Sequence, residues 1–388
     1  MSIHKNIKLL SWLNFCCDFR IYSAIAVLYF AQVTGSFTLA LGVFSVGKIA
    51  SSVFELPTGV LSDFVGRKMT VVFGQASSIL AITCYAIGGS FTVLAIGAIL
   101  EGLAFAFFSG NNSALLYDSL KEGGKEDRYS EYEGKTSSMF QIALGISALI
   151  GSITLGFESF RFLFWLSVIP QLVGFILAFQ LVEPKRHYRN IEANIFSHLG
   201  VALKKFKENT KLRTLSIAQI VGYGIGESMH QFSPAFLATL WPAWAIAFAR
   251  VLSHLFSTIG YRLSGALIRK FGELRVLMWG NFANFIVGTT IIAYPTVVTP
   301  LVNSITSVVY GTGSVAQSSL LQKEFSDEQR ATMGSLNSLA GSLFFGVASV
   351  VLGVWADKVG PTYALLTGQL LSAPVLFLYW RLFKKHNS

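Results

Sequence analysis

The sequence predicts an all-α polytopic membrane protein, with twelve transmembrane helices in two pseudo-symmetric six-helix bundles. Three observations lead to this class: the composition, the recurrence of long apolar runs, and an internal repeat. Of 388 residues, 53% are hydrophobic and 13% are charged, and the mean hydropathy is +0.57. Soluble domains have about 45–50% apolar and about 25% charged residues. A soluble globular protein is therefore excluded.

Apolar runs long enough to cross a bilayer recur along the chain. A hydrocarbon core of roughly 30 Å requires about 20 residues of helix. The first run is long enough to span, so we expect a retained helix and not a cleaved signal peptide. The predicted spans are 9–32, 39–62, 69–90, 93–116, 135–157, 162–182, 213–236, 243–265, 275–294, 297–322, 331–354 and 362–381.

The distribution of positive charge predicts the orientation. Twelve spans place both termini on one side, and a cytoplasmic N-terminus puts most cations of the short links inside, as the positive-inside rule requires. Only Arg161 and Lys358 then lie outside. The formal charge of +10 is thus explained by membrane topology and not by nucleic acid binding. The lipid bilayer is therefore the expected surrounding partner of the protein.

The longest polar link divides the chain into halves. We expect an N-terminal bundle over 1–182, a basic cytoplasmic linker over 183–212 and a C-terminal bundle over 213–388. The linker contains an apolar patch at 195–203, which fits either an amphipathic helix on the inner leaflet or a solvated tether.

The two halves repeat each other. The stretch GVLSDFVGRKMTVVFG (59–74) aligns with GALIRKFGELRVLMWG (265–280), and each copy joins the second and third spans of its half. Internal repeats of this kind are typical of secondary transporters, whose binding site lies near the midplane where the repeats meet.

The first copy also carries a recognisable motif. Gly59, Asp63, Gly66, Arg67 and Lys68 resemble the G-x-x-x-D-x-x-G-R-K loop of the major facilitator superfamily. The resemblance implies a monomeric transporter in which two six-helix bundles alternate about a central site. It also implies that the motif acid engages the start of the eleventh helix and closes the cytoplasmic side.

Elementary electrostatics agrees with such a gate. A helix N-terminus stabilises a carboxylate such as Asp63 by about 0.3–1 kcal/mol, which biases a balanced equilibrium. Glu55, near Pro57 and the cytoplasmic end of its span, is expected to serve the same gate. The alternative is that Arg67 and Lys68 only fix topology while Asp63 caps a helix. In the second copy Arg269 replaces the acid, so this turn cannot make the same contact.

Two departures from the family pattern bear on function. The fourth span lacks the arginine typical of proton-driven members, and Glu101 is its only charge. The fifth span lacks the Gly-Pro motif of drug antiporters. The stretch SGNNSALLYDSL (109–120) resembles the end of the fourth helix in a bacterial subgroup of the family, and QRATMGSLNSL (329–339) resembles the start of its eleventh helix. This resemblance implies a location in a bacterial inner membrane.

Ionisable residues inside the spans are the best candidates for function, because a charge in the bilayer centre is costly and faces a cavity or a partner. Asn14, Asp18 and Tyr22 are spaced by four residues and are expected to share the cavity face of one helix, opposite Arg20. His230 is expected at the membrane interface. We expect a buried charge cluster of Asp18, Arg20, Lys48, Glu55 and Glu101. The candidates for proton coupling or substrate binding are Asp18, Arg20, Lys48, Glu101, Glu227, Arg250 and His254.

The sequence offers no site for a catalytic reaction. It has no P-loop, no HExxH spacing and no nucleophile and base arrangement. Cys16, Cys17 and Cys84 lack metal-ligand spacing and are expected to be packing residues. We therefore expect no enzyme, metal or cofactor, and a proton gradient as the energy source.

The function expected from these observations is secondary active transport of a small solute, coupled to protons and directed toward efflux by antiport. Uptake of a small polar or anionic solute by symport is the alternative, because Arg20, Lys48 and Arg250 suit an anion. A different class, a membrane receptor or lipid-handling protein without transport, is also compatible with the composition.

Overall fold

The computed structural model describes residues 2–109, 111–184, 206, 208–324 and 330–387. These residues form two compact units, the first made of Met1–Arg189 with Ala243–Val251 and the second of Asn190–Pro242 with Leu252–Ser388. The apolar patch at 195–203 lies outside the described residues, and the predicted boundaries at 182 and 213 stay a prediction.

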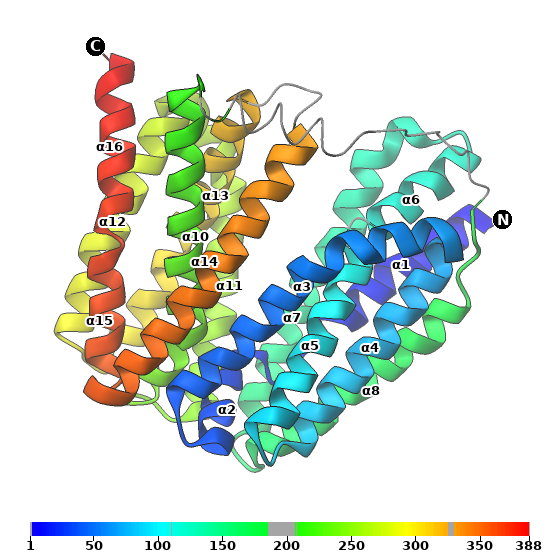
Figure 1. Cartoon of the computed structure of the whole chain (residues 1–388), viewed down its shortest axis with the longest axis horizontal. Helices are drawn as coiled ribbons and strands as arrows, with labels where there is room; N and C mark the ends of the chain where they lie inside the picture. The colour runs from blue at the N-terminus through cyan, green and yellow to red at the C-terminus, as the bar shows by residue number, and fades with distance from the viewer. Residues whose placement is uncertain (1, 110, 185–205, 207, 325–329, 388) are drawn as a thin grey trace. The chain divides into compact units, whose positions relative to one another are not determined.

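The described part of the chain consists of helices joined by short turns (Figure 1). The helices up to residue 189 are α1 (Ser2–Asp18), η1 (Ser23–Ile25), α2 (Ala26–Thr34), α3 (Phe37–Val65), α4 (Arg67–Ile87), α5 (Phe91–Phe108), α6 (Asn111–Glu122), η2 (Glu126–Arg128), α7 (Tyr129–Thr154) and α8 (Phe160–Phe179). Those after it are α10 (Thr210–Leu237), α11 (Ala243–Phe271), α12 (Glu273–Ala293), α13 (Thr299–Glu324), α14 (Arg330–Val359), α15 (Pro361–Leu371) and α16 (Ala373–Asn387).

Helices occupy all twelve predicted spans, which confirms the fold class. Ten helical stretches among the described residues are long and apolar enough to cross a membrane. The remaining two predicted spans are α10 and α13. Three spans expected as single helices are interrupted: α1 and α2 divide the first, α5 and α6 the fourth, and α15 and α16 the last.

The helix ends follow from local sequence. The hydroxyl of Ser36 accepts a hydrogen bond from the backbone N–H of Leu39 at the start of α3, and Ser90 caps α5 in the same way. The Asn209 side chain caps α10. Such caps satisfy backbone donors that the first turn of a helix leaves without partners.

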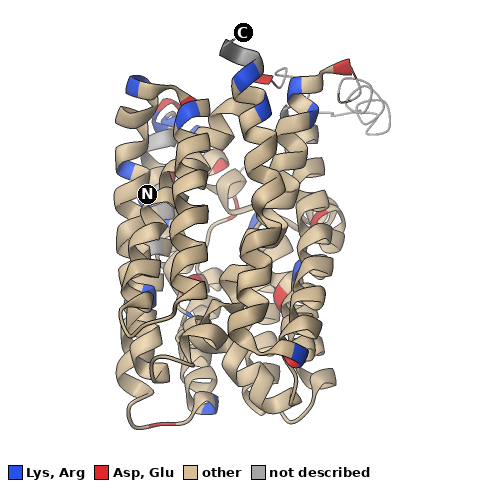
Figure 2. Ribbon diagram, turned by 90° about the vertical axis from the view of Figure 1, so that its left-hand side faces the viewer, with Lys and Arg blue, Asp and Glu red and all other residues tan. Residues whose placement is uncertain are grey.

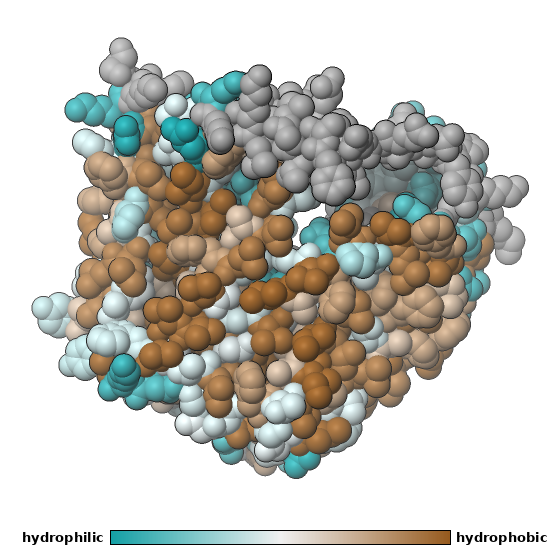
Figure 3. Space-filling model, viewed as in Figure 1, coloured by the Kyte–Doolittle hydropathy of each residue, from teal (hydrophilic) through white to brown (hydrophobic). Residues whose placement is uncertain are grey.

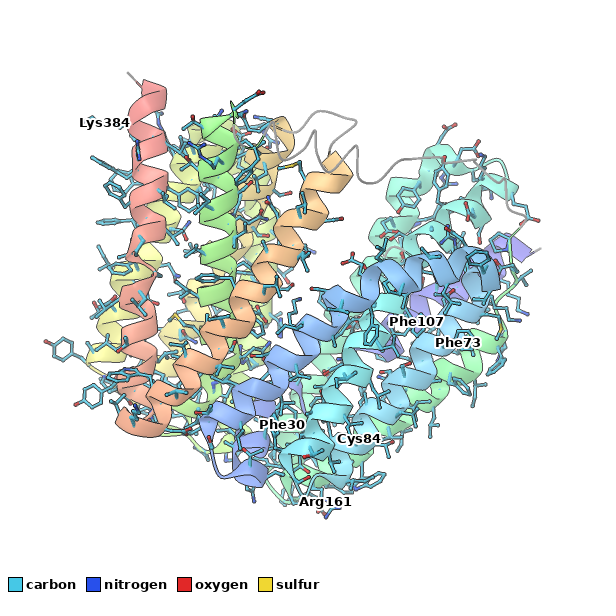
Figure 4. The ribbon with its side chains drawn as sticks, in the orientation of Figure 1. Phe30, Phe73, Cys84, Phe107, Arg161 and Lys384 are labelled. Atoms are coloured by element: carbon cyan, nitrogen blue, oxygen red, sulfur yellow. The ribbon has the colours of Figure 1, made fainter. Side chains whose placement is uncertain are left out.

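In the first unit α3, α4, α5 and α8 lie side by side (Figure 1). Gly102 of α5 permits the closest approach, because a Cβ at this position would lie 2.4 Å from the carbonyl oxygen of Gly47 on α3. Phe73 of α4 packs on Phe107 of α5 with ring centroids 6.1 Å apart (Figure 4). Arg161, at the start of α8, donates a hydrogen bond to the carbonyl oxygen of Ala86.

The second unit repeats the α3 to α4 turn of the first in its α11 to α12 turn. Gly66 has φ 104° and ψ 152°, and Gly272 has φ 81° and ψ 152°. A positive φ is costly for any residue except glycine. The backbone therefore agrees with the sequence repeat at these two aligned glycines.

The charge distribution is that of a membrane protein. Figure 2 shows long uncharged stretches along the helices, with many charged residues near helix ends. Apolar side chains cover much of the face shown in Figure 3. The exposed apolar residues include Phe64, Ile153 and Ile176, which suit contact with lipid better than contact with water.

Candidate functional site

The first span is interrupted inside the membrane segment, and side chains from α8 satisfy the backbone at the break. Helix α1 ends at Asp18, which leaves carbonyl groups without helical partners. The Gln171 amide donates to the carbonyl oxygen of Cys16 at 2.6 Å, and the Ser167 hydroxyl accepts from the backbone N–H of Ile21 at 3.0 Å. Broken helices are tolerated at membrane depth only where such partners or a cavity are present.

Arg20 lies directly after the break and forms a buried salt bridge with Glu101 of α5. Its side chain is 10% exposed and that of Glu101 is 22% exposed. The Arg20 Nε also donates to the carbonyl oxygen of Cys17 at 3.0 Å. The Tyr85 hydroxyl donates to the second carboxylate oxygen of Glu101 at 2.7 Å. Removing one partner of a buried pair costs about 3–5 kcal/mol, because the other charge is left uncompensated.

Aromatic rings enclose one side of this pair. Tyr22 stacks on Phe164 with centroids 4.2 Å apart, and its hydroxyl lies 3.5 Å from a Glu101 oxygen. The Arg20 guanidinium lies 4.8 Å from the ring centre of Phe105. Water is largely excluded here, which strengthens the electrostatic attraction within the pair.

The expected common face of Asn14, Asp18 and Tyr22 is wrong. The helical periodicity stops at Asp18, so Tyr22 lies beyond the helix and contacts Glu101, the partner of Arg20. Asn14 does not stand alone in a cavity either, because its amide donates to the carbonyl oxygen of Thr136 on α7 at 3.2 Å.

Asp18, the last residue of α1, is half-buried. Within the described residues its carboxylate forms no hydrogen bond and no salt bridge. Asp18 therefore differs from Glu101, whose two carboxylate oxygens are both engaged.

The predicted five-residue charge cluster forms only in part. The structure joins Arg20 and Glu101. The carboxylate of Glu55 is exposed and lies 3.5 Å from the Ser109 hydroxyl, which donates to it. Lys48 is half-buried on α3, one turn before Ser52, whose hydroxyl donates to the Lys48 carbonyl oxygen. Glu55 thus lies apart from the buried pair.

The residues from Ser62 to Lys68, here called the motif turn, connect α3 to α4. Asp63 and Arg67 lie 3.7 Å apart, and the Asp63 side chain is 70% exposed, so this pair contributes at most about 1 kcal/mol. Arg67 is better held by other groups. Its guanidinium donates to the Ser62 hydroxyl at 3.0 Å and lies 3.8 Å from Asp118 of α6.

A carboxylate that the sequence analysis did not select caps the motif turn. The two oxygens of Glu183 accept hydrogen bonds from the backbone N–H groups of Arg67 and Lys68, each at 2.8 Å. These are the first two residues of α4, where free N–H groups and the helix dipole favour an anion. A Cβ on Gly66 would lie 2.9 Å from a Glu183 oxygen. Gly66 therefore provides both the positive φ and the space for the cap.

The sequence contained a signal for Asp118, the residue of α6 that lies beside Arg67. Asn111 and Asp118 are two helical turns apart in the stretch noted for its family resemblance, so they share a face of α6. Asn111 donates to the carbonyl oxygen of Arg67 and accepts from Ser62. Glu183 had no comparable signal, because it follows the last helix of the unit and is distant in sequence.

In the second unit Glu227 lies on α10, where the Gln231 amide donates to its carboxylate at 2.8 Å. Arg250 and His254 are one turn apart on α11 and both half-buried. The boundary between the two units falls between Arg250 and His254, so the two residues belong to different units. At the second copy of the motif, Glu273 forms a salt bridge with Lys323.

Comparison with known proteins identifies the family. The sequence profile described as Major Facilitator Superfamily matches residues 9–345. The chain belongs to the Major Facilitator Superfamily. An uncharacterised MFS-type transporter of Methanocaldococcus jannaschii is 21% identical over 340 residues, which cover 85% of this chain and 86% of that protein.

Solved structures show the same fold. The nucleoside transporter NupG superposes with a TM-score of 0.82 at 16% identity, covering 99% of this chain and 100% of NupG. A D-xylose-proton symporter gives 0.75 at 13% identity, with 97% and 96% covered. Members of the Major Facilitator Superfamily are transporters and not enzymes. The protein is thus a multi-pass membrane protein and a secondary transporter of small molecules.

Proposed function

We propose that this protein couples the movement of a small solute to protons, with Asp18 as the proton-binding residue, and that it works as an efflux antiporter. One observation carries the proposal. Asp18 ends a broken transmembrane helix and is half-buried, and within the described residues its carboxylate forms no hydrogen bond and no salt bridge. A carboxylate in a site of low polarity exchanges protons when a mobile cation approaches or leaves.

The neighbouring pair supports this assignment. Glu101 is held by Arg20 and Tyr85, and its protonation would remove the negative charge that attracts Arg20. Asp18 has no such contacts to lose. We assign the Arg20 and Glu101 pair the role of positioning the break, because Arg20 also binds the Cys17 carbonyl group.

The same geometry weakens the anion symport alternative. Arg20, one of the three cations that favoured an anionic solute, is neutralised by Glu101 and is not available to a substrate. A proton symporter among the structural neighbours supports coupling to protons in this fold. The symporter does not indicate whether this chain exports its solute or takes it up.

We further propose that the protein acts as a monomer in the bacterial inner membrane, with both termini in the cytoplasm. It would use the proton gradient without a cofactor and without nucleic acid. The motif turn, through Asp63 and the residues that hold Arg67, would stabilise one of the two alternating states.

Proteoliposomes loaded with a fluorescent pH indicator test the coupling and its direction. A panel of nucleosides, pentoses, organic cations and organic anions is added outside. Antiport makes the interior alkaline as a solute enters, and symport makes it acidic. We expect the interior to become alkaline with the unmodified protein. The Asp18→Asn variant should abolish this pH change but still exchange solute between equal concentrations inside and outside. Glu158→Gln, an exposed loop variant, is the matched control. An unchanged signal in Asp18→Asn would overturn the assignment.

A further inference from the structure

A polar cavity lies between α10, α13 and α14 in the second unit. It has a volume of about 250 Å³, and its lining residues include Gln219, Tyr223, Ser318, Leu321, Asn337 and Ser338. Helix α10 packs against both of the other helices. Helices α10 and α13 are also the two predicted spans that are absent from the ten apolar stretches. Some of the polar side chains that distinguish these two helices thus face a cavity and not lipid, which would leave them without hydrogen-bond partners.

Asn337 of α14 fixes the polar wall of the cavity. The residue is 8% exposed, and its amide N–H groups donate to the Ser216 hydroxyl and to the Gln219 side-chain oxygen, each at 3.1 Å. A side-chain amide has two N–H donors, so both donors of Asn337 are used inside the protein. The two bonds fix the orientation of the Asn337 and Gln219 amides, and each amide keeps its other polar group for a ligand.

These other groups are one acceptor and one donor on neighbouring amides. Within the described residues the Asn337 carbonyl oxygen and the Gln219 N–H groups have no hydrogen-bond partner, and neither is fully buried. Because a hydrogen bond joins the two amides, the acceptor and the donor are held in a fixed arrangement. A ring lactam carries an N–H donor and a C=O acceptor on one edge, so it can satisfy both groups at once.

The cavity is electrically neutral. No charged residue is among the described residues that line it. The next charged residues along α13, Lys323 and Glu324, each form a salt bridge with an opposite charge. Glu227 lies two helical turns beyond Gln219 on α10 and is not a lining residue. A charged ligand would lose its water here without gaining an ionic partner, so the cavity favours an uncharged molecule.

The remaining lining residues suit a planar ring. Tyr223 is 37% exposed, and its ring packs on α14, because a Cβ on Gly341 would lie 3.1 Å from a ring carbon. Leu321 adds a second apolar surface. The Ser318 and Ser338 hydroxyls form no hydrogen bond within the described part of the chain, so polar substituents of a ring can bind them. Sites for drug-sized ligands measure roughly 300–1,000 Å³, so the cavity suits a single ring.

We infer that this cavity binds a small uncharged ring with a lactam edge. The C=O group of the ligand accepts from the Gln219 amide, and its N–H group donates to the Asn337 carbonyl oxygen. The inference rests on the proposed transport function and names its substrate class. The cavity lies toward the ends of α10, α13 and α14 that are predicted to be cytoplasmic, which is where an exporter would take up its solute. It does not involve the proton-binding residue, Asp18, so the two assignments are tested independently.

Calorimetric titration of the full-length protein in detergent tests the site. Uracil is the probe, because it is an uncharged ring with lactam N–H and C=O groups. Dimethyluracil, methylated on both ring nitrogens, keeps the ring and the carbonyl groups but has no N–H donor. We expect uracil to bind more tightly by about tenfold or more, because the methylated ring leaves the Asn337 oxygen unpaired. Orotate, the same ring with a carboxylate, should also bind more weakly than uracil.

A substitution at Gln219 tests the donor. Gln219→Glu keeps an oxygen that accepts from Asn337 and replaces the N–H donor with a second acceptor. This variant should weaken uracil binding by about tenfold or more. Gln180→Glu is the matched control, because it makes the same change at an exposed glutamine of the first unit. It should leave uracil binding unchanged.

Absence of uracil binding, equal binding of uracil and dimethyluracil, or unchanged binding in a folded Gln219→Glu variant would overturn the site. Tighter binding of meso-erythritol than of uracil would also overturn it, because the two amides would then recognise a polyol. If Gln219→Glu does not fold, the comparison of the two rings in the unmodified protein decides alone. Loss of the site leaves the pH signal of Asp18 intact in proteoliposomes with another solute. Failure of proton coupling, by contrast, leaves calorimetric binding intact.

Discussion

Substitutions at Gly66 and Glu183 test whether the Glu183 carboxylate stabilises the motif turn by capping α4. Alanine at 66 must adopt φ 104° and ψ 152°, a region used almost only by glycine, at a cost of about 1–3 kcal/mol. Its Cβ would also lie 2.9 Å from a Glu183 oxygen and displace the cap. Losing an exposed carboxylate at a helix N-terminus costs about 1 kcal/mol. We therefore expect Gly66→Ala to destabilise the protein by about 2–4 kcal/mol.

A double-mutant cycle separates strain from capping. Glu183→Gln alone should cost about 1 kcal/mol, but much less in the Gly66→Ala background, where the cap is already lost. Gly272→Ala is the matched control, because Gly272 has a similar backbone conformation and a Cβ there meets nothing within 4 Å. That variant should show strain alone and no coupling to Glu183. The measurement is equilibrium unfolding by SDS in mild detergent. Additive effects of Gly66→Ala and Glu183→Gln, within about 0.3–0.5 kcal/mol, would refute the capping argument.

Two further variants address the break and the helix packing by the same unfolding assay. Gln171→Leu leaves the Cys16 carbonyl group unpaired in a buried site and should cost about 1–3 kcal/mol; a neutral effect would show that the amide does not support the break. Gly102→Ala places a methyl group 2.4 Å from the Gly47 carbonyl oxygen, and overpacking of this kind costs about 1–3 kcal/mol. Gly134→Ala, where a Cβ meets nothing within 4 Å, is its control and should not destabilise; equal losses in both would contradict the close approach.

The sequence was sufficient for the class of fold because membrane helices are fixed by local composition. Apolar length located every span, and the aligned glycines Gly66 and Gly272 predicted the repeated turn. Charge in the spans also pointed to Arg20 and Glu101, which the structure brings together.

The contacts that hold the site could not be predicted from periodicity. Placing residues on one face by helical periodicity assumes an unbroken helix. The first helix of this span ends at Asp18, where a side chain of α8 binds a carbonyl group that the break leaves without a helical partner. Nothing near Asp18 in sequence indicates that Gln171 lies there. Glu183 was missed for the same reason, since its role depends on the end of α8 lying beside the start of α4.

The break in the first span also has a mechanical meaning. A continuous helix transmits rotation and axial displacement along its whole length, because each turn is bonded to the next. Here Gln171 of α8 binds the end of α1 at Cys16, and Ser167 of α8 binds Ile21 in the segment between the two helices. Helix α2 packs on α8 separately, through Tyr29 and Phe164. Displacement of α2 is therefore not passed rigidly to α1. The segment that carries Arg20 lies at the joint, where a small change of backbone angle moves a charge without moving a whole helix.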